Sequence, residues 1–523
     1  MLQMLCAEEA QCLSVGYVKF SRCSGVLLHL TSLPSRFGIG DMGSAAYEFA
    51  DFLAGAGQKL WQVLPLTPTG YGDSPYQGFS AFAGNPLLID LEPLRERGLL
   101  VASDLAGAAA LPGEFVDFGL VIHFKLAALR RAAENFLSQG LADERERFAA
   151  FCLENSLWLD DYALFMACKG VHNGVVWTDW APEIRQRSAD ALKEWSAKLA
   201  LDVQVFKYWQ FEFFRQWNGL KAYCRARGIR IMGDIPIYVA HDSADVWAHS
   251  ELFQLDEKGN SSVVAGVPPD YFSATGQLWG NPIYRWDVLA SSGYRWWVDR
   301  FRASLKMFDL VRLDHFRGFE AYWEIPATAA TAAYGRWMPG PGSGFFRALV
   351  AELGELPVVA ENLGVVTPEV EALRKEFGFP GMSLLQFAFG SDPQGPSFRP
   401  HNYSRELAAY TGGHDNDTTV GWWTSGIGDS TRTAEDVRSE REFARSYLGF
   451  EDEEISWVFI RTVLASVADI AVMPLQDLLG LGNEARMNLP GTVKGNWTWR
   501  YKRGELTGEV RERLRELTRI YER

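Results

Sequence analysis

Eight short, apolar, β-rich runs, each ending in polar or special residues, most constrain what this chain can fold into. Near-continuous apolar runs, unlike alternating ones, are typical of parallel strands that are buried on both faces. The runs cover residues 25–30, 60–66, 230–239, 310–316, 357–363, 383–389, 410–414 and 469–475. The sequence therefore predicts an α/β fold with a parallel sheet at its centre.

Amphipathic helices are predicted between several of these runs. Residues 44–56 and 206–227 have apolar residues at helical spacing and stop at a glycine just before the next run. Residues 367–377 start with a Thr-Pro signal and also end at a glycine. Eight strand–helix units fit a (β/α)8 TIM barrel. A doubly wound open sheet is the alternative, but no GxGxxG fingerprint follows the first run.

Two intervals between runs are too long for a plain barrel. We interpret them as insertions around the carboxyl-terminal face of the strands, at about 67–205 (a mainly helical subdomain) and about 240–309 (an active-site loop subdomain). Residues 1–24 have no signal-peptide pattern and are interpreted as a loose N-terminal extension. Residues 25–523 would then form a single catalytic barrel.

Charge and composition exclude several classes of partner. The net charge of −14 argues against nucleic acid and against an anionic membrane surface, which both favour a basic face. No apolar run is long enough for a transmembrane helix. The six cysteines have no CxxC spacing, so reduced thiols are expected. We therefore expect a cytoplasmic protein without a nucleic-acid or membrane partner.

The aromatic content, 13% of all residues, is high. Sugar rings have apolar C–H faces that stack on aromatic planes, and carbohydrate sites use such residues heavily. A large aromatic core would explain the same composition, and composition alone favours that reading.

Acidic residues stand at the ends of three predicted strands. Arg312 and Asp314 are two positions apart on a strand, so they point to the same side, and the arginine would keep the carboxylate ionised for nucleophilic attack. Glu361 directly follows four apolar residues, where burial would raise its pKa toward use as a general acid. His414 and Asp415 follow two glycines that permit close approach of a ligand. Each pattern alone also fits a structural ion pair or a loop.

Together these patterns favour glycosidic-bond chemistry. Clustered carboxylates are costly unless a function requires them. One ionised and one protonated carboxyl group flanking a bond are the minimum for cleavage through an oxocarbenium-like state. A third acid could hold sugar hydroxyls and distort the ring. The sequence does not separate retaining from inverting chemistry, because that depends on the distance between the two carboxyl groups.

At this point the sequence resembles the 4-α-glucanotransferase family (amylomaltase or disproportionating enzyme, glycoside hydrolase family 77). The resemblance spans nearly all of the chain from about residue 24. Six segments in family order carry it: PLTPTGYGDSPYQGFSAFAGNP (65–86), GDIPIYVAHDSADVW (233–247), AGVPPDYFSATGQLWGNPIY (265–284), RLDHFRGF (312–319), AENLG (360–364) and HDNDT (414–418).

The resemblance implies a role for each of the matched residues. Asp314 would be the nucleophile, Glu361 the general acid/base and Asp415 the transition-state stabiliser. Eight residues are implied as substrate contacts: Arg312, His414, Asp234, Tyr71, Asp73, Tyr271, Phe272 and Trp279. Segment 265–284 would form a flexible loop over the cleft. The family implies no metal and no other cofactor.

The implied reaction is retaining transfer of α-1,4-glucan segments between maltooligosaccharides or other α-1,4-glucans. Transfer needs acceptor binding to outcompete water in a poorly hydrated site. An α-amylase-type hydrolase with the same residues is the nearest alternative. A catalytically silent glucan-binding protein is a second, and a metal-assisted or sugar-phosphate barrel enzyme a third; for the third, residues 480–482 are only a feeble phosphate-loop candidate.

Overall fold

All eight predicted runs overlap a strand of one parallel sheet. The computed structural model describes residues 20–269, 273–426, 433–451 and 454–523. The strands are β1 (Cys23–Leu27), β2 (Leu60–Gln62), β3 (Arg230–Ile235), β6 (Leu310–Leu313), β9 (Val358–Ala360), β10 (Gly381–Leu384), β11 (Leu407–Tyr410) and β12 (Ile470–Pro474). Their order is β10-β11-β12-β1-β2-β3-β6-β9. The Ala360 amide donates to the Pro380 carbonyl at 2.8 Å, joining the two outer strands. The predicted (β/α)8 barrel is therefore confirmed.

Three strands start earlier than the sequence runs that predicted them, and the first of them, β1, begins two residues before its run. The expected run 383–389 begins inside β10, and the expected run 410–414 touches β11 only at its last residue, Tyr410. Strand β11 has the sequence LAAY, in which alanines give little apolar signal and have a low strand propensity. Its neighbours β10 and β12 define it as a strand by pairing.

The helices that alternate with the strands cover the outside of the barrel. Two of the three predicted ones begin and end within a residue or two of prediction, whereas α8 starts six residues earlier than expected. The helices of this layer are α1 (Ser44–Gly55), α8 (Ala200–Ala226), α11 (Arg295–Met307), α12 (Gly342–Leu353), α13 (Pro368–Glu376), α16 (Ile455–Ala465), α17 (Leu475–Leu478) and α18 (Gly508–Ile520).

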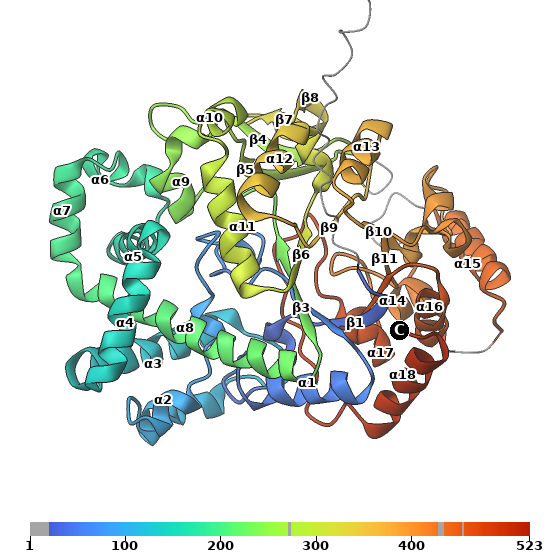
Figure 1. Cartoon of the computed structure of the whole chain (residues 1–523), viewed down its shortest axis with the longest axis horizontal. Coiled ribbons are helices and arrows are strands. Elements are labelled where there is room, and N and C mark those ends of the chain that lie inside the picture. Colours follow the sequence, from blue (N-terminus) through green and yellow to red (C-terminus); the bar gives the residue numbers. More distant parts are fainter. Residues whose placement is uncertain (1–19, 270–272, 427–432, 452–453) are drawn as a thin grey trace, which may run out of the picture.

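The interval between β2 and β3 contains several helices. In Figure 1 most of its helices lie to one side of the barrel, opposite α14–α18. They are α2 (Glu92–Glu96), α3 (Phe118–Gln139), α4 (Ala142–Glu154), α5 (Ser156–Val171), α6 (Pro182–Arg185) and α7 (Ala189–Lys198). On the other side, α14 (Thr419–Thr424) and α15 (Ala434–Leu448) follow β11.

A four-stranded antiparallel sheet, which the sequence did not predict, lies beside the barrel. Its order is β5-β4-β7-β8. Strands β4 (Val263–Val267) and β5 (Gln277–Pro282) come before β6, whereas β7 (Ala321–Pro326) and β8 (Arg336–Pro339) come after it. The short helices α9 (Ala244–Ala248) and α10 (Trp286–Ser291) flank the first pair. The pairing of β4 with β7 brings together segments on both sides of a barrel strand, and no local pattern reveals such a contact.

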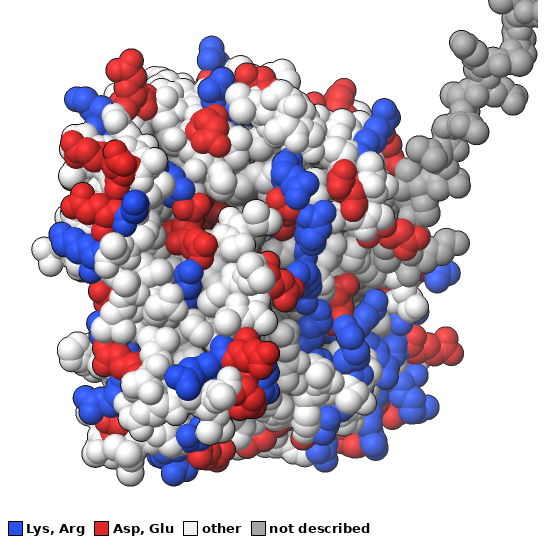
Figure 2. Space-filling model, turned by 60° about the vertical axis from the view of Figure 1, so that its left-hand side comes forward, with Lys and Arg blue, Asp and Glu red and all other residues white. Residues whose placement is uncertain are grey.

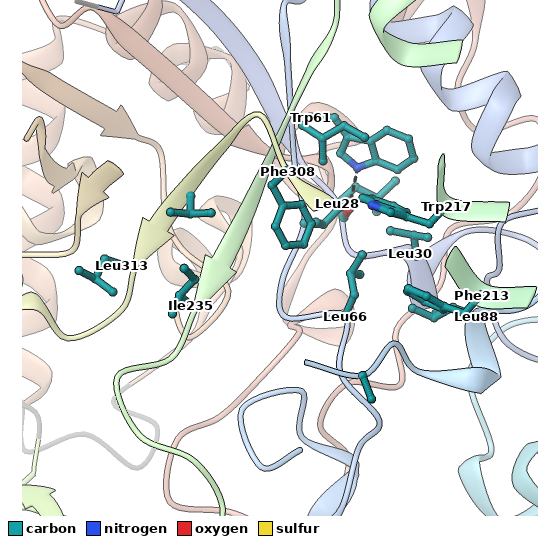
Figure 3. Packing of buried hydrophobic residues seen from close by; sticks show 14 of the residues in the cluster. Leu28, Leu30, Trp61, Leu66, Leu88, Phe213, Trp217, Ile235, Phe308 and Leu313 are labelled. Atoms are coloured by element: carbon teal, nitrogen blue, oxygen red, sulfur yellow. Dashed lines mark hydrogen bonds between the residues drawn. The ribbon is translucent and has the colours of Figure 1, made fainter. Parts of the chain in front are cut away.

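Large aromatic side chains fill the space between the barrel and its helices (Figure 3). Trp61 and Trp217 are fully buried, and the Trp61 indole donates to the Leu28 carbonyl at 2.8 Å. Phe308 packs against β3 at Gly233, where a Cβ atom would lie 2.1 Å from the ring. The high aromatic content therefore serves the core to a large extent.

Helix α8 also holds the loop that follows β2. The Gln210 side chain donates to the Gly84 carbonyl at 2.8 Å and accepts from the Gly84 amide at 2.7 Å. Gln216 makes the same pair of bonds with Asp90, at 3.0 and 2.8 Å. A helix of the barrel layer thus fixes a loop of the long insertion, and the same loop carries Tyr76 to Asp234 at the carboxyl end of β3.

Two arginines tie the ends of the described chain to the amino-terminal face of the barrel. Strand β1 begins at Cys23, inside the stretch 1–24 that the sequence suggested as an extension; residues 1–19 lie outside the described ranges. Arg22 donates to the carbonyls of Ser466, Ala468 and Leu464 at 2.9–3.1 Å. Arg523 donates to the same three carbonyls at 2.8–3.0 Å. These carbonyls belong to the segment that enters β12.

The surface carries charges of both signs, and the described cysteines are unpaired. Figure 2 shows Lys and Arg side chains interspersed with Asp and Glu over the visible face. The four cysteines of the described ranges, Cys23, Cys152, Cys168 and Cys224, are free thiols. None of the helices within those ranges combines the length and the apolar character needed to cross a membrane.

Candidate active site

An arginine bridges two carboxylates at the carboxyl ends of β3 and β6. Asp234 and Arg312 are paired neighbours in the sheet register. Arg312 Nη1 lies 2.9 and 2.8 Å from the two carboxylate oxygens of Asp234, and 2.9 Å from Asp314 Oδ1. The Asp234 side chain is fully buried, whereas that of Asp314 is 25% exposed. Asp314 is thus the carboxylate that can reach a ligand, with a fixed positive charge beside it.

Glu361 follows β9 and faces the same arginine. Its Oε2 accepts from the His315 amide at 2.7 Å and its Oε1 from the Leu363 amide at 2.9 Å. Burial raises the pKa of Glu361 to about 8, and the negative charge of Asp314 adds to the rise, against the opposing effects of Arg312 and the two amides. Near neutral pH the protonated form therefore predominates, as a general acid requires.

The backbone between the two carboxyl groups has an unusual conformation at His315. This residue follows Asp314 and has φ 47°, in the left-handed region. The turn brings its amide onto Glu361, and Phe316 N donates to the Glu361 carbonyl at 3.0 Å. Burial lowers the pKa of the His315 imidazole to about 4. A neutral ring therefore lies beside the carboxylates.

Tyr76 joins the loop after β2 to this cluster. Its hydroxyl donates to Asp234 Oδ2 at 2.8 Å, and burial raises the pKa of the Tyr76 phenol well above its usual value, which keeps it a donor. Its ring stacks on His414 at a centroid distance of 5.1 Å. The sequence reading did not select Tyr76, although it lies in the segment 65–86 beside Tyr71 and Asp73, which were selected.

Asp415, after β11, is held by the long loop that follows β12. Asn488 Nδ2 donates to Asp415 Oδ1 at 2.7 Å, and Arg486 donates to the Asp415 carbonyl at 2.7 Å. His414 Nε2 lies 3.4 Å from Asp415 Oδ2. The Asp415 side chain is 52% exposed, and it lies close enough to Tyr76 to influence that pKa, as do Asp234 and Asp314. Asn488 and Arg486 were not identified from the sequence, where no motif distinguishes them.

The residues predicted to contact substrate at the rim of the cleft differ in how close they lie to the carboxylate cluster. Trp279, on β5, packs edge-to-face on His315 at 4.9 Å, so it belongs to the site. Tyr71 is 77% exposed, and none of the described contacts joins it or Asp73 to the carboxylate cluster. Asp73 has φ 56°, and burial raises the pKa of its carboxyl group. Tyr271 and Phe272 lie outside the described residues.

The charge at the centre of the cluster is the guanidinium of Arg312, within 4 Å of three carboxyl groups. Within the described ranges, no group of three or more His, Cys, Asp or Glu side chains is arranged to hold a metal ion. The site thus contains an exposed carboxylate beside a positive charge, a buried carboxylic acid and a third acid on a neighbouring loop. This arrangement can protonate a leaving oxygen and stabilise positive charge on a sugar ring.

Such a cluster at the carboxyl ends of the strands defines a (β/α)8-barrel enzyme of the glycoside-cleaving class. The chain belongs to the 4-alpha-glucanotransferase family, whose sequence model matches residues 28–507. The resemblance seen in the sequence is thereby confirmed, and with it the assignment to the glucan-transferring enzymes.

Individual relatives agree with the family assignment. A 4-alpha-glucanotransferase of Thermus thermophilus is 52% identical over 97% of this chain and 100% of its own length. One of Synechocystis is also 52% identical, over 96% of this chain and 98% of its own. The solved amylomaltase of Streptococcus agalactiae, in complex with acarbose, is 40% identical, covers 96% of this chain and 99% of its own, and superposes with a TM-score of 0.91.

Proposed function

We propose that the enzyme transfers segments of α-1,4-glucan to the 4-hydroxyl of glucose or of another glucan by double displacement. The observation that carries this proposal is the contrast between two carboxyl groups on one arginine. Asp314 is partly exposed beside the Arg312 guanidinium, whereas burial raises the pKa of Glu361 to about 8. A nucleophile and an acid are thus differentiated by their surroundings.

In the first step Asp314 attacks the anomeric carbon while Glu361 gives its proton to the glycosidic oxygen. The bond to the leaving glucan breaks, and a β-glucosyl ester forms on Asp314. In the second step Glu361, now ionised, takes the proton of the acceptor 4-hydroxyl, which attacks the anomeric carbon and releases Asp314. The α-1,4 link is restored, so the enzyme retains the configuration.

The remaining residues take no part in proton transfer, and we assign them to binding the sugar rings. We assign Asp415 to stabilisation of the distorted ring through its hydroxyls, and Arg312, His414 and Asp234 to the sugar around the breaking bond. Trp279, packed on His315, would offer an apolar face to a glucosyl ring and limit the access of water. For the rim residues Tyr71, Asp73, Tyr271 and Phe272 we propose contacts further along the glucan.

We further propose that the chain from β1 onward acts as one cytoplasmic catalytic unit, in which the segments 67–205 and 240–309 wall the cleft. The bonds from Gln210 and Gln216 to the loop after β2 support the first assignment. The free thiols of the described cysteines support a reducing compartment.

The test is incubation of the purified enzyme with maltotriose in the absence of phosphate and metal. We expect glucose and a ladder of longer maltooligosaccharides, with a constant number of reducing ends. Rising reducing ends with only shorter products would assign the enzyme to the hydrolases. The Asp314→Asn variant should lose transfer by a factor of about 10³ or more, because no covalent ester can form. Full activity of this variant would show that the nucleophile is misassigned.

A further inference from the structure

A cavity of about 720 Å³ lies apart from the carboxylate cluster. It is bounded by α6, by the turn closed by the Leu255–Ser261 bridge, and by the start of α10. None of the residues assigned to catalysis lines it. Its volume is in the range of sites that hold small ligands, roughly 300–1,000 Å³. Neither the reaction steps nor the rim residues described above account for this cavity.

The lining of the cavity suits an uncharged polyhydroxyl ligand. Trp286 is half-buried and contributes an aromatic surface. Arg185, Lys258 and Arg285 supply donors, while Glu251, Asp256, Glu257 and Asp287 supply acceptors, so charges of both signs line the cavity. Paired donors and acceptors around an aromatic plane match sugar hydroxyls and a sugar C–H face.

The walls of the cavity are held in place by hydrogen bonds and packing contacts within the protein itself. Trp177 donates to the His241 carbonyl at 2.9 Å, and the His241 ring bonds to the Gly259 carbonyl at 2.7 Å. Gly259 has φ 86°, and a Cβ atom there would lie 2.3 Å from the Trp177 ring. The turn is therefore seated closely on Trp177, and the cavity is preformed.

Successive aromatic rings connect the cavity to the active site. Tyr284 lines the cavity and stacks on Tyr238 at 6.0 Å; Tyr238 lies 6.4 Å from Trp279, which packs on His315. The Tyr284 hydroxyl also donates to the Ile237 carbonyl, three residues after Asp234. A continuous series of ring contacts thus links the lining of the cavity to His315 in the active site.

We propose that this cavity is an auxiliary site for α-1,4-glucan, which binds one stretch of a long chain on Trp286 while the cleft acts on another. The choice of α-1,4-glucan as the ligand of this cavity rests on the function proposed above. A second contact raises the local concentration of long chains at the cleft and does nothing for chains too short to span both sites. Long linear glucans therefore gain affinity, whereas maltotriose does not.

The test fills the cavity without removing a core side chain. Ser250 is exposed and lines the cavity, so Ser250→Trp should block it. Ser138→Trp, at an exposed position on α3, is the matched control. We expect Ser250→Trp to raise KM for amylose about three- to tenfold, with KM and kcat for maltotriose unchanged. A second variant, Glu251→Ala, removes a largely exposed acceptor and should shift the amylose KM in the same direction.

Binding is measured independently of turnover by electrophoresis in gels that contain amylose. Wild type and Ser138→Trp should be retarded equally, and Ser250→Trp less. Equal retardation of all three, or an unchanged amylose KM, would overturn the auxiliary site. Equal losses on amylose and maltotriose would also overturn it, since they would show an effect on the catalytic centre. Failure of wild type to transfer glucan at all would instead contradict the proposed function, whatever the gels show.

Discussion

At the scale of single residues, Arg312 organises the charge of the site. One of its nitrogens bonds to Asp234 and Asp314, and the other lies 3.9 Å from Glu361 Oε2. A planar guanidinium can serve several carboxylates in fixed directions, which a lysine ammonium cannot. The same positive charge opposes the effect of burial on the Glu361 pKa, so the value of about 8 reflects a balance between the two.

That balance predicts the pH dependence of the first step. Glu361 donates a proton when it is protonated, so kcat/KM for maltotriose should fall as the pH rises through about 8. An α-maltosyl fluoride donor needs no proton for its leaving group, and its reaction should lack this alkaline limb. The Glu361→Gln variant should lose about 10²- to 10⁴-fold in kcat/KM on maltotriose, whereas the initial release of fluoride from the fluoride donor should fall much less, because that step needs no proton. A wild-type profile on maltotriose that stays level up to pH 10 would contradict the assignment.

A second residue-scale prediction concerns Asn488, whose amide donates to Asp415. The Asn488→Ala variant should lower kcat about tenfold, by the cost of one lost hydrogen bond to a charged group, with a smaller change in KM. Asn483→Ala is the control, because Asn483 lies on the same loop but donates to Asp417 instead. Steady-state kinetics on maltotriose measure both. Equal losses in the two variants would indicate a general effect of the loop.

The sequence identified the residues that follow a strand within a short motif. Asp234, Arg312, Asp314 and Glu361 directly end or follow apolar runs, and the structure brings these four together. Asn488 could not be found in this way, because it reaches Asp415 through a loop contact between positions far apart in sequence. Asparagine in a loop carries no signal of its own, since it is common there for turn formation.

At the scale of elements, the barrel strands were predictable and the second sheet was not. A strand buried on both faces has a continuous apolar run, so seven of the eight could be read locally and β11 could not. Strands β4, β5, β7 and β8 form a sheet in which β4 pairs with β7, so the sheet depends on contacts between segments that β6 separates. β11 shows the limit of the method, since only its neighbours identify its alanines as a strand.

Helix α8 permits a prediction at this scale. Gln210 is fully buried and satisfies both the amide and the carbonyl of Gly84. The Gln210→Ala variant leaves these two groups unpaired and should destabilise the fold by about 2–4 kcal/mol, seen as a lower melting temperature. Gln204→Ala, on the same helix but only half-buried, should melt close to wild type. If both variants melt like wild type, the loop after β2 does not depend on α8.

At the scale of the whole molecule, stability and chemistry belong to opposite ends of the barrel. The carboxyl groups lie where the strands end, whereas Arg22 and Arg523 bind carbonyls where β12 begins. The hydrogen bonds of Arg22 and Arg523, at the end of the barrel where β12 begins, stabilise the fold but involve no residue of the active site.

Substitution of Arg22 tests this separation. The Arg22→Ala variant loses several bonds to the segment that enters β12 and should have a clearly lower melting temperature. Its kcat on maltotriose at 25 °C should stay within about twofold of wild type. Arg145→Ala, at an exposed position, is the control and should change neither quantity. A large fall in kcat without a change in melting temperature would contradict the separation.

The meeting of Arg22 and Arg523 on one segment has a practical consequence for attaching the enzyme to other materials. A fusion partner or a solid support joined after Arg523 would lie at the face of the barrel opposite the carboxyl groups. Immobilised molecules should therefore keep the mouth of the barrel open to bulky polysaccharide. Because residues 22 and 523 approach the same carbonyls, a short linker between them should also allow circular permutation, with new ends placed in an exposed loop.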